Sequence, residues 1–113
     1  MNVANTGRVR KFFKVLQTAE KSQTAMMTLK PGEQSGPKSN EHPKSEQVLI
    51  VLEGQVVAEI GTKTRTLKAG DSVIVPLGTR HRFVNKSNRQ VVTFNVYAPP
   101  AYEPDEESDG PDE

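Results

Sequence analysis

The chain has 113 residues, of which 34% are hydrophobic, and its formal net charge is +1. This length suits one domain with a single modest core. The sequence contains no Cys, which excludes disulfides, thiolate metal sites and cysteine nucleophiles. No apolar run approaches the roughly 20 residues of a membrane span, and the first residues do not resemble a signal peptide. We therefore expect a cytoplasmic protein without a membrane partner.

Charge is unevenly distributed along the chain. Residues 98–113 contain seven acidic residues and no Lys or Arg, which leaves seven acids against 15 bases in residues 1–97. We favour a solvated acidic tail, because such runs are usually disordered. The alternative is a tail that folds back on the basic body. The bases are scattered and only four Phe and two Tyr are present, so we expect no nucleic-acid partner.

The hydrophobic residues occur in short runs without a helical period, which indicates β-strands. Gly and Pro residues fill a loop at residues 31–37, and turns at 53–54 and 61–62 are interpreted as hairpins. The expected strands are residues 8–16, 24–30, 47–52, 55–60, 63–67, 72–75, 81–85 and 90–97. The sequence therefore predicts an all-β protein, a small closed antiparallel barrel with almost no helix.

The first expected strand is unusually apolar. It contains Phe12, Phe13, Val15 and Leu16, more apolar surface than so small a barrel readily buries. We therefore expect a homodimer, with residues 1–23 as the dimer-forming strand region. Residues 24–100 form the barrel, and residues 101–113 form the acidic tail.

Residues 70–85 carry the most informative spacing in the chain. Gly70 and Gly78 permit turns with positive φ. Pro76 has no N–H for a sheet ladder and ends a strand. His81 opens the next strand with its side chain committed to one face, and Asn85 follows four residues later.

This spacing, Gly-x5-Pro-x-Gly-x2-His-x3-Asn, resembles the second motif of the cupin family at all five fixed positions. A degraded copy of the first cupin motif, Gly-x5-His-x-His-x(3,4)-Glu-x6-Gly, lies upstream. Gly54 closes it, Gln47 stands where the pattern has Glu, His42 takes the second His position, and Asn40 takes the first. The resemblance covers residues 24–100. It implies a jelly-roll-like barrel, the double-stranded β-helix, in which the second-motif histidine is a metal ligand.

The resemblance implies a metal-ligand set of His42, His81, Gln47 and Asn40. The ion would be a divalent transition metal such as Fe, Mn, Ni, Zn or Cu. Only the two imidazoles are strong donors, and the family's anion is missing, so burial opposes the charge of the ion. Glu46 could restore a carboxylate only through a β-bulge. The sequence leaves open a weakly held metal or a metal-free polar cluster around water.

Strand alternation predicts which side chains line the barrel interior. We select residues that share a face with His81 or Gln47, the apolar face of the last strand, and one methionine of the second strand. The expected ligand-pocket residues are Phe83, Leu49, Val51, Phe94 and Met26, with Met27 as the alternative methionine.

Three functions follow as alternatives. The first is the binding of a small polar molecule inside the barrel, with or without a divalent metal. The second, suggested by the resemblance, is a metal-dependent enzyme of the dioxygenase or sugar or keto-acid isomerase type. The third is a non-catalytic, oligomeric interaction protein that uses its acidic tail. No catalytic residue can be assigned, and the fold alone does not choose among the three.

Overall fold

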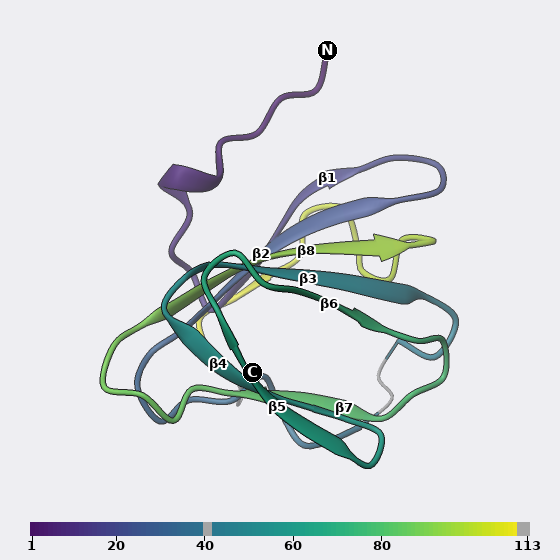
Figure 1. Cartoon of the computed structure of the whole chain (residues 1–113). Helices are drawn as coiled ribbons and strands as arrows, with labels where there is room; N and C mark the ends of the chain where they lie inside the picture. Colours follow the sequence, from purple (N-terminus) through teal and green to yellow (C-terminus); the bar gives the residue numbers. More distant parts are fainter. Residues whose placement is uncertain (40–41, 111–113) are drawn as a thin grey trace.

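Two antiparallel sheets face each other in the computed structural model, which describes residues 1–39 and 42–110 (Figure 1). The larger sheet has the order β6-β3-β8-β2-β1-β9, and the smaller has the order β5-β4-β7. The strands are β1 (Phe13–Thr18), β2 (Gln23–Leu29), β3 (Glu46–Glu53), β4 (Gln55–Ile60), β5 (Lys63–Lys68), β6 (Ser72–Val75), β7 (His81–Val84), β8 (Val91–Ala98) and β9 (Glu107–Ser108). This architecture confirms the predicted all-β, jelly-roll-like fold.

Helix is almost absent, as predicted. Within the described part of the chain, the helical element is a single 3-10 turn, Thr6–Arg8, whose first residues are capped by the Asn5 side chain. None of the described helical residues forms a segment long and apolar enough to cross a membrane.

The core lies between the two sheets. Paired residues on neighbouring strands share a face, so the register Val51↔Thr93↔Met27↔Phe13 identifies one inward row of the larger sheet. Opposite this row, Phe83 of the smaller sheet is 1% exposed. The buried core cluster consists of Met27, Leu29, Leu49, Val51, Val56, Ala58, Leu67, Val75, Phe83 and Val91. The longest strands, β3 and β8, are rich in Val and lie side by side near the centre of the sheet.

The turn at residues 53–54 connects the two sheets rather than closing a hairpin. β3 belongs to the larger sheet and β4 to the smaller one, so the hairpin interpretation of this turn is wrong. Gly54 has φ of 80°, and a Cβ there would lie 2.5 Å from the Gln90 carbonyl oxygen. The expected turn at residues 61–62 does close the β4–β5 hairpin, with Ile60 paired to Lys63.

The first strand begins later than predicted, at Phe13 rather than at residue 8. Phe12 and Phe13 pack against the protein's own core, and Val15 is buried. β1 is an integral strand of the larger sheet. The apolar side chains of this strand therefore do not themselves require a partner subunit, and the homodimer stays a prediction that a sedimentation mass would test.

The backbone of the acidic tail packs on the barrel over residues 101–110, while residues 103–107 and 109 stay exposed. The expectation of a disordered tail is therefore wrong for this segment. Its residues Glu107–Ser108 form β9, which pairs with Phe13 and Lys14 of β1. The tail thus adds an edge strand to the larger sheet, in agreement with the alternative in which it folds back on the basic body.

Candidate functional site

A loop that follows β2 brings the two histidines together. Ser39 in this loop pairs with His81 at the start of β7 through two backbone hydrogen bonds of 3.0 and 3.2 Å. Three residues later, a turn in which the Ser45 N–H donates to the His42 carbonyl at 3.1 Å turns His42 inward. The two rings lie with centroids 4.6 Å apart. The side chains are nearly buried, at 6% and 7% exposure.

The intact second motif positions His81 as expected. Pro76 follows the last residue of β6, and Gly78 has a positive φ of 74° in the turn that leads to β7. The Nδ1 atom of His81 lies 2.9 Å from the Thr79 carbonyl oxygen. Because a carbonyl can only accept a hydrogen bond, Nδ1 carries the hydrogen. Asn85 does not join the site, because its buried side-chain amide donates a hydrogen bond to the Leu29 carbonyl oxygen at 2.9 Å.

A directed chain of hydrogen bonds connects β8 to His42. The Thr93 hydroxyl lies 3.2 Å from the Met27 carbonyl oxygen, and Asn95 Nδ2 faces both Thr93 Oγ1 at 3.0 Å and the Ala25 carbonyl at 3.4 Å. The Met27 carbonyl only accepts, so the Thr93 hydroxyl donates to it and accepts from Asn95. The Ala25 carbonyl also only accepts, so the amide nitrogen of Asn95 faces Thr93 and Ala25. The side-chain oxygen of Asn95 is then left to accept a hydrogen bond from the next member of this hydrogen-bond network.

The next member of the hydrogen-bond network is Gln47 of β3. Its Nε2 donates to Asn95 Oδ1 at 2.9 Å, so its Oε1 faces His42 Nε2 at 3.1 Å. An amide oxygen only accepts, so His42 Nε2 carries a hydrogen and donates it. His42 Nδ1 lies farther from its own acceptor, 3.4 Å from the Ser45 carbonyl oxygen, so in a neutral ring the bond to Gln47 favours the hydrogen on Nε2. All three side chains are buried, where such networks are strong when every member has its partner.

The described residues bring together part of the metal-ligand set that the resemblance implies, and metal binding at this set stays a prediction. His42 and His81 come together with Gln47, but Asn40 lies outside the described residues. His42 Nε2 is occupied by its hydrogen bond to Gln47 and offers no lone pair. Glu46 is exposed, as expected for a regular strand. Across residues 1–39 and 42–110, no three His, Asp or Glu side chains are grouped to hold an ion.

A cavity of about 220 Å³ opens beside the two histidines. Its wall combines aromatic and thioether side chains with the polar groups of the site. The lining residues are Phe12, Phe13, Met27, Ser35, His42, Gln47, His81, Phe83, Tyr97, Tyr102, Glu106, Ser108 and Gly110. The aromatic rings are in mutual contact, with centroid separations of 4.8 Å for Phe13–Tyr102, 5.1 Å for Tyr97–Tyr102 and 5.1 Å for His42–Tyr97.

The predicted pocket residues divide into three groups. Phe83 lines the cavity, whereas Leu49 and Val51 face inward but lie in the core outside the cavity wall. Met26 and Phe94 are paired with each other on the opposite face of the larger sheet, so their placement in the pocket was wrong. Met27 takes the place expected for Met26.

Several residues of the cavity wall and of its polar network were not found from the sequence. Thr93, Asn95 and Tyr97 form the inward face of β8, although Val92, Phe94 and Val96 form its more apolar face. The interior needs polar groups to pair with Gln47 and His42, and this requirement decides the face. Tyr102 was missed because it lies in the tail. The regular Thr-x-Asn-x-Tyr alternation was the available signal for β8.

A larger groove of about 670 Å³ lies between the outer strands β5 and β6. Leu67, Val73 and Ile74 are among its apolar residues, and Lys63, Arg65 and Asp71 are among its polar ones. It contains no histidine and none of the buried polar network. The histidines and the buried polar network therefore favour the smaller cavity as the functional site.

Two facing antiparallel sheets with this strand order define the class of double-stranded β-helix proteins. Residues 25–97 match the family model described as "Cupin domain". This chain belongs to the cupin family.

Several proteins are similar to this chain over most of its length. Protein L612 of Acanthamoeba polyphaga mimivirus is 30% identical over 97 residues, which cover 82% of this chain and 59% of that protein. Protein YrkC of Bacillus subtilis is 29% identical over 108 residues, covering 87% and 57%. The chain thus spans less than two thirds of the length of both relatives.

Solved structures agree with the fold. The crystal structure of BH2720 from Bacillus halodurans has a TM-score of 0.86 at 27% identity, covering 95% of this chain and 87% of that one. The crystal structure of TT1209 from Thermus thermophilus has a TM-score of 0.78 at 25% identity, covering 88% and 98%.

Proposed function

We propose that this cupin binds a small molecule in the cavity beside His42 and His81, and that binding does not need a resident metal. The observation that carries the proposal is the cavity itself, in which a contiguous aromatic wall surrounds a few polar groups. Apolar walls with a few placed polar groups are typical of small-molecule sites. The volume of about 220 Å³ is below the roughly 300–1,000 Å³ of drug-sized sites, so the ligand is small.

The lining favours a particular chemistry. The rings of Phe13, Phe83, Tyr97 and Tyr102 suit a planar apolar group, and the polar cluster suits one hydrogen-bonding group. Among the described lining residues, no Lys or Arg is present, and Glu106 supplies a carboxylate. A neutral or cationic ligand should therefore bind better than an anionic one, since a buried anion needs a cationic partner.

Three matched probes test this function. Benzyl alcohol, benzylamine and benzoate share one ring and differ in charge, and each can be titrated into labelled protein while amide NMR shifts are recorded. The pH should lie well above the ordinary imidazole pKa of about 6.5. We expect shifts of residues around the cavity with benzyl alcohol and benzylamine, and the weakest binding with benzoate.

Two phenylalanines of the larger sheet provide a matched pair of variants. Phe13 lines the cavity, whereas Phe94 lies on the outer face, and both are partly buried. Loss of one aromatic contact costs about 0.5–1.5 kcal/mol, or about 2- to 12-fold in affinity. Phe13→Leu should weaken benzyl alcohol binding by this factor, and Phe94→Leu should not. Absence of binding by all three probes, or equal effects of both variants, would overturn the proposal.

A further inference from the structure

The acidic tail builds one wall of the cavity. Four lining residues come from it: Tyr102, Glu106, Ser108 and Gly110. The ring of Tyr102 lies 4.8 Å from that of Phe13 and 6.4 Å from that of His42, measured between centroids. The tail therefore covers the polar site with an aromatic ring supplied from outside the predicted barrel.

The start of the tail, Ala101 and Tyr102, is anchored by Gln23 of β2, whose side chain is only 1% exposed. Gln23 Oε1 accepts hydrogen bonds from the N–H groups of Ala101 and Tyr102, each at 3.0 Å. Its Nε2 donates to the Tyr102 carbonyl and to Thr18 Oγ1, each at 2.8 Å. A buried amide with partners at both ends holds its neighbours in place. This anchor should persist when the rest of the tail moves.

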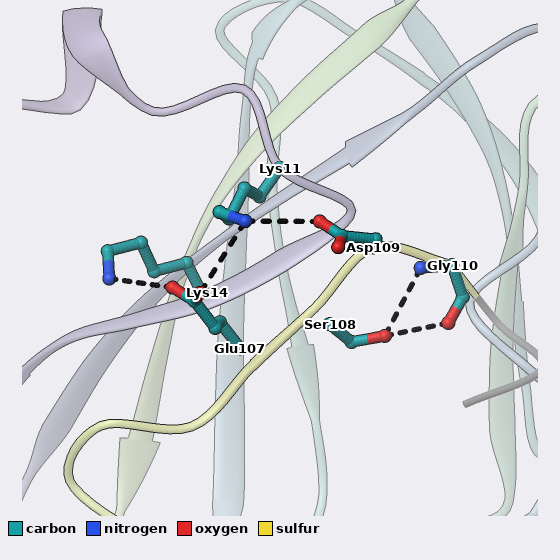
Figure 2. Close-up of polar contacts among 6 residues, drawn as sticks. All are labelled: Lys11, Lys14, Glu107, Ser108, Asp109 and Gly110. Atoms are coloured by element: carbon teal, nitrogen blue, oxygen red, sulfur yellow. Dashed lines mark hydrogen bonds and ion pairs between the residues drawn. The ribbon is translucent and has the colours of Figure 1, made fainter.

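The later part of the tail, from Glu106 to Asp109, is held by weaker contacts. The Val15 N–H donates to the Glu106 carbonyl at 2.9 Å, and β9 is only two residues long. Figure 2 shows the remaining contacts, in which Lys14 Nζ lies 3.1 Å from a carboxylate oxygen of Glu107, and Lys11 Nζ lies 3.5 Å from Glu107 and 3.1 Å from Asp109. These side chains are 36–79% exposed, so their attraction is modest and is screened by salt.

We propose that residues 103–110 form a releasable strap, that the ligand enters the cavity when this strap leaves β1, and that Tyr102 contacts the bound ligand. This inference rests on the proposed function, because it assigns the entry route and a further binding residue to the same cavity. The strap differs from the neighbouring wall elements. Strands β2 and β3 have partners on both sides, whereas β9 is an edge strand with exposed ion pairs.

The strap makes binding kinetics sensitive to salt. The Debye length falls from about 30 Å at 0.01 M to about 3 Å at 1 M ionic strength, which weakens the pairs of Lys11 and Lys14 with the tail. The strap then leaves β1 more often, and a neutral probe should enter and leave the cavity faster. A neutral probe is required because salt would also screen the charge of an ionic one.

Benzyl alcohol serves as the probe, with its exchange rates measured by NMR line shapes in the full-length protein. The double variant Lys11→Ala/Lys14→Ala should raise both rates, on the order of 5-fold, and should lose most of the salt dependence. The matched control is Lys21→Ala/Lys63→Ala, which removes two exposed lysines elsewhere and should leave the rates unchanged. Exchange of the Val15 amide, whose partner is Glu106, should speed up in the first double variant only.

Tyr102 is tested by affinity. Tyr102→Ala should weaken benzyl alcohol binding several-fold, and Tyr102→Phe should retain most of it, because the ring rather than the hydroxyl forms the wall. Unchanged rates in Lys11→Ala/Lys14→Ala, or unchanged affinity in Tyr102→Ala, with the probe still bound at the cavity would overturn the strap and leave the proposed function intact. A failure of the parent protein to bind any probe would overturn both.

Discussion

At His42, the position of the ring hydrogen is set by Gln47, whose own orientation depends on residues that the ring does not touch. The Ala25 carbonyl and the Thr93 hydroxyl orient Asn95. Asn95 orients Gln47, and Gln47 presents its oxygen to His42 Nε2 at 3.1 Å. An imidazole that keeps a hydrogen on Nε2 cannot offer that nitrogen to a metal. In this structure His42 is a hydrogen-bond donor to Gln47, and we therefore expect it to be a poor metal ligand.

This role predicts one tautomer for neutral His42. His42 Nδ1 also faces an acceptor, the Ser45 carbonyl oxygen at 3.4 Å, so the shorter contact of Nε2 with Gln47 at 3.1 Å decides which nitrogen carries the hydrogen. Long-range hydrogen–nitrogen correlation spectra at mildly alkaline pH should show most of the neutral ring with the hydrogen on Nε2. Gln47→Leu removes the acceptor, so the preference should diminish, whereas Gln55→Leu on the exposed start of β4 should not affect it. A bare Nε2 in the parent protein would show that the hydrogen-bond chain runs in the opposite direction.

Gln47 also explains why metal affinity should be low, and it offers a way to restore it. Gln47→Glu places a carboxylate beside His42 and His81, which supplies the anion that the family pattern has at this position. We expect Ni²⁺ or Mn²⁺ to bind the variant at least about tenfold more tightly than the parent, a gain of about 1.4 kcal/mol. Calorimetric titration measures this difference.

The controls separate a real site from added surface charge. Gln55→Glu adds the same charge at an exposed position and should have little effect. His81→Ala in the Gln47→Glu background should abolish the gain. Equal metal affinity in parent and Gln47→Glu would contradict our account of the site.

At the scale of elements, the strap responds to pH through its ion pairs. Hydrogen bonding to Lys14, then the charges of Lys11 and Lys14, hold the pKa of the Glu107 carboxyl below its ordinary value of 4.5. A hydrogen bond to Asp109, then the charges of Asp109 and Glu107, raises the pKa of Lys11 above 10.5. A lowered carboxyl pKa stabilises the packed strap above pH 4.5, and this stabilisation is lost as pH falls through the shifted value. A raised amine pKa stabilises it below pH 10.5, and this stabilisation is lost as pH rises.

The strap should therefore be packed most firmly between these limits and loosen on the acid side as Glu107 is protonated. A carboxyl-carbon NMR titration of Glu107 should give a midpoint below 4.5, and Lys14→Ala should move that midpoint upward. Lys21→Ala should leave it unchanged. A midpoint at or above the ordinary value in the parent would mean that the tail does not pack on β1 in solution.

The turn at Gly54, where the chain passes from the larger sheet to the smaller one, gives a second prediction at the scale of elements. Ala at Gly54 would meet the Gln90 carbonyl oxygen at 2.5 Å, whereas Ala at Gly78 would meet nothing within 4 Å, and both positions have positive φ. Gly78→Ala should cost about 1 kcal/mol of unfolding free energy from backbone strain alone. Gly54→Ala should cost about 1–3 kcal/mol more, because the turn must also shift. Urea midpoints of the two variants would test this, and equal losses would contradict it.

Elements differed in how well the sequence predicted them. The turns at Gly61 and Gly78 were predictable because their chemistry is local. The face of β8 was not, because apolarity favoured Phe94 while the buried partners of Gln47 and His42 required Asn95 and its neighbours to point inward. The packing of the tail was only the alternative, because composition alone indicates disorder. Its pairing with β1 involves lysines 98 and 93 residues away in the sequence.

For the whole molecule, the spacing of strands, the degraded first motif and the intact second motif were sufficient to predict the barrel and the convergence of His42 and His81. The cavity itself could not be predicted in the same way, since its wall combines residues of both sheets, the first strand and the tail. Phe13 and Tyr102, 4.8 Å apart between ring centroids, lie at opposite ends of the chain. Contacts of this kind follow from the packed fold rather than from any local pattern.

The central claim is that this cavity is the binding site, and intermolecular nuclear Overhauser effects with benzyl alcohol test it most directly. We predict contacts from the probe to the ring hydrogens of Phe13, His81 and Tyr102, and none to Phe94. Contacts to Leu67 and Ile74 instead, in the groove between β5 and β6, or no contacts to any cavity residue at saturating probe, would contradict the account.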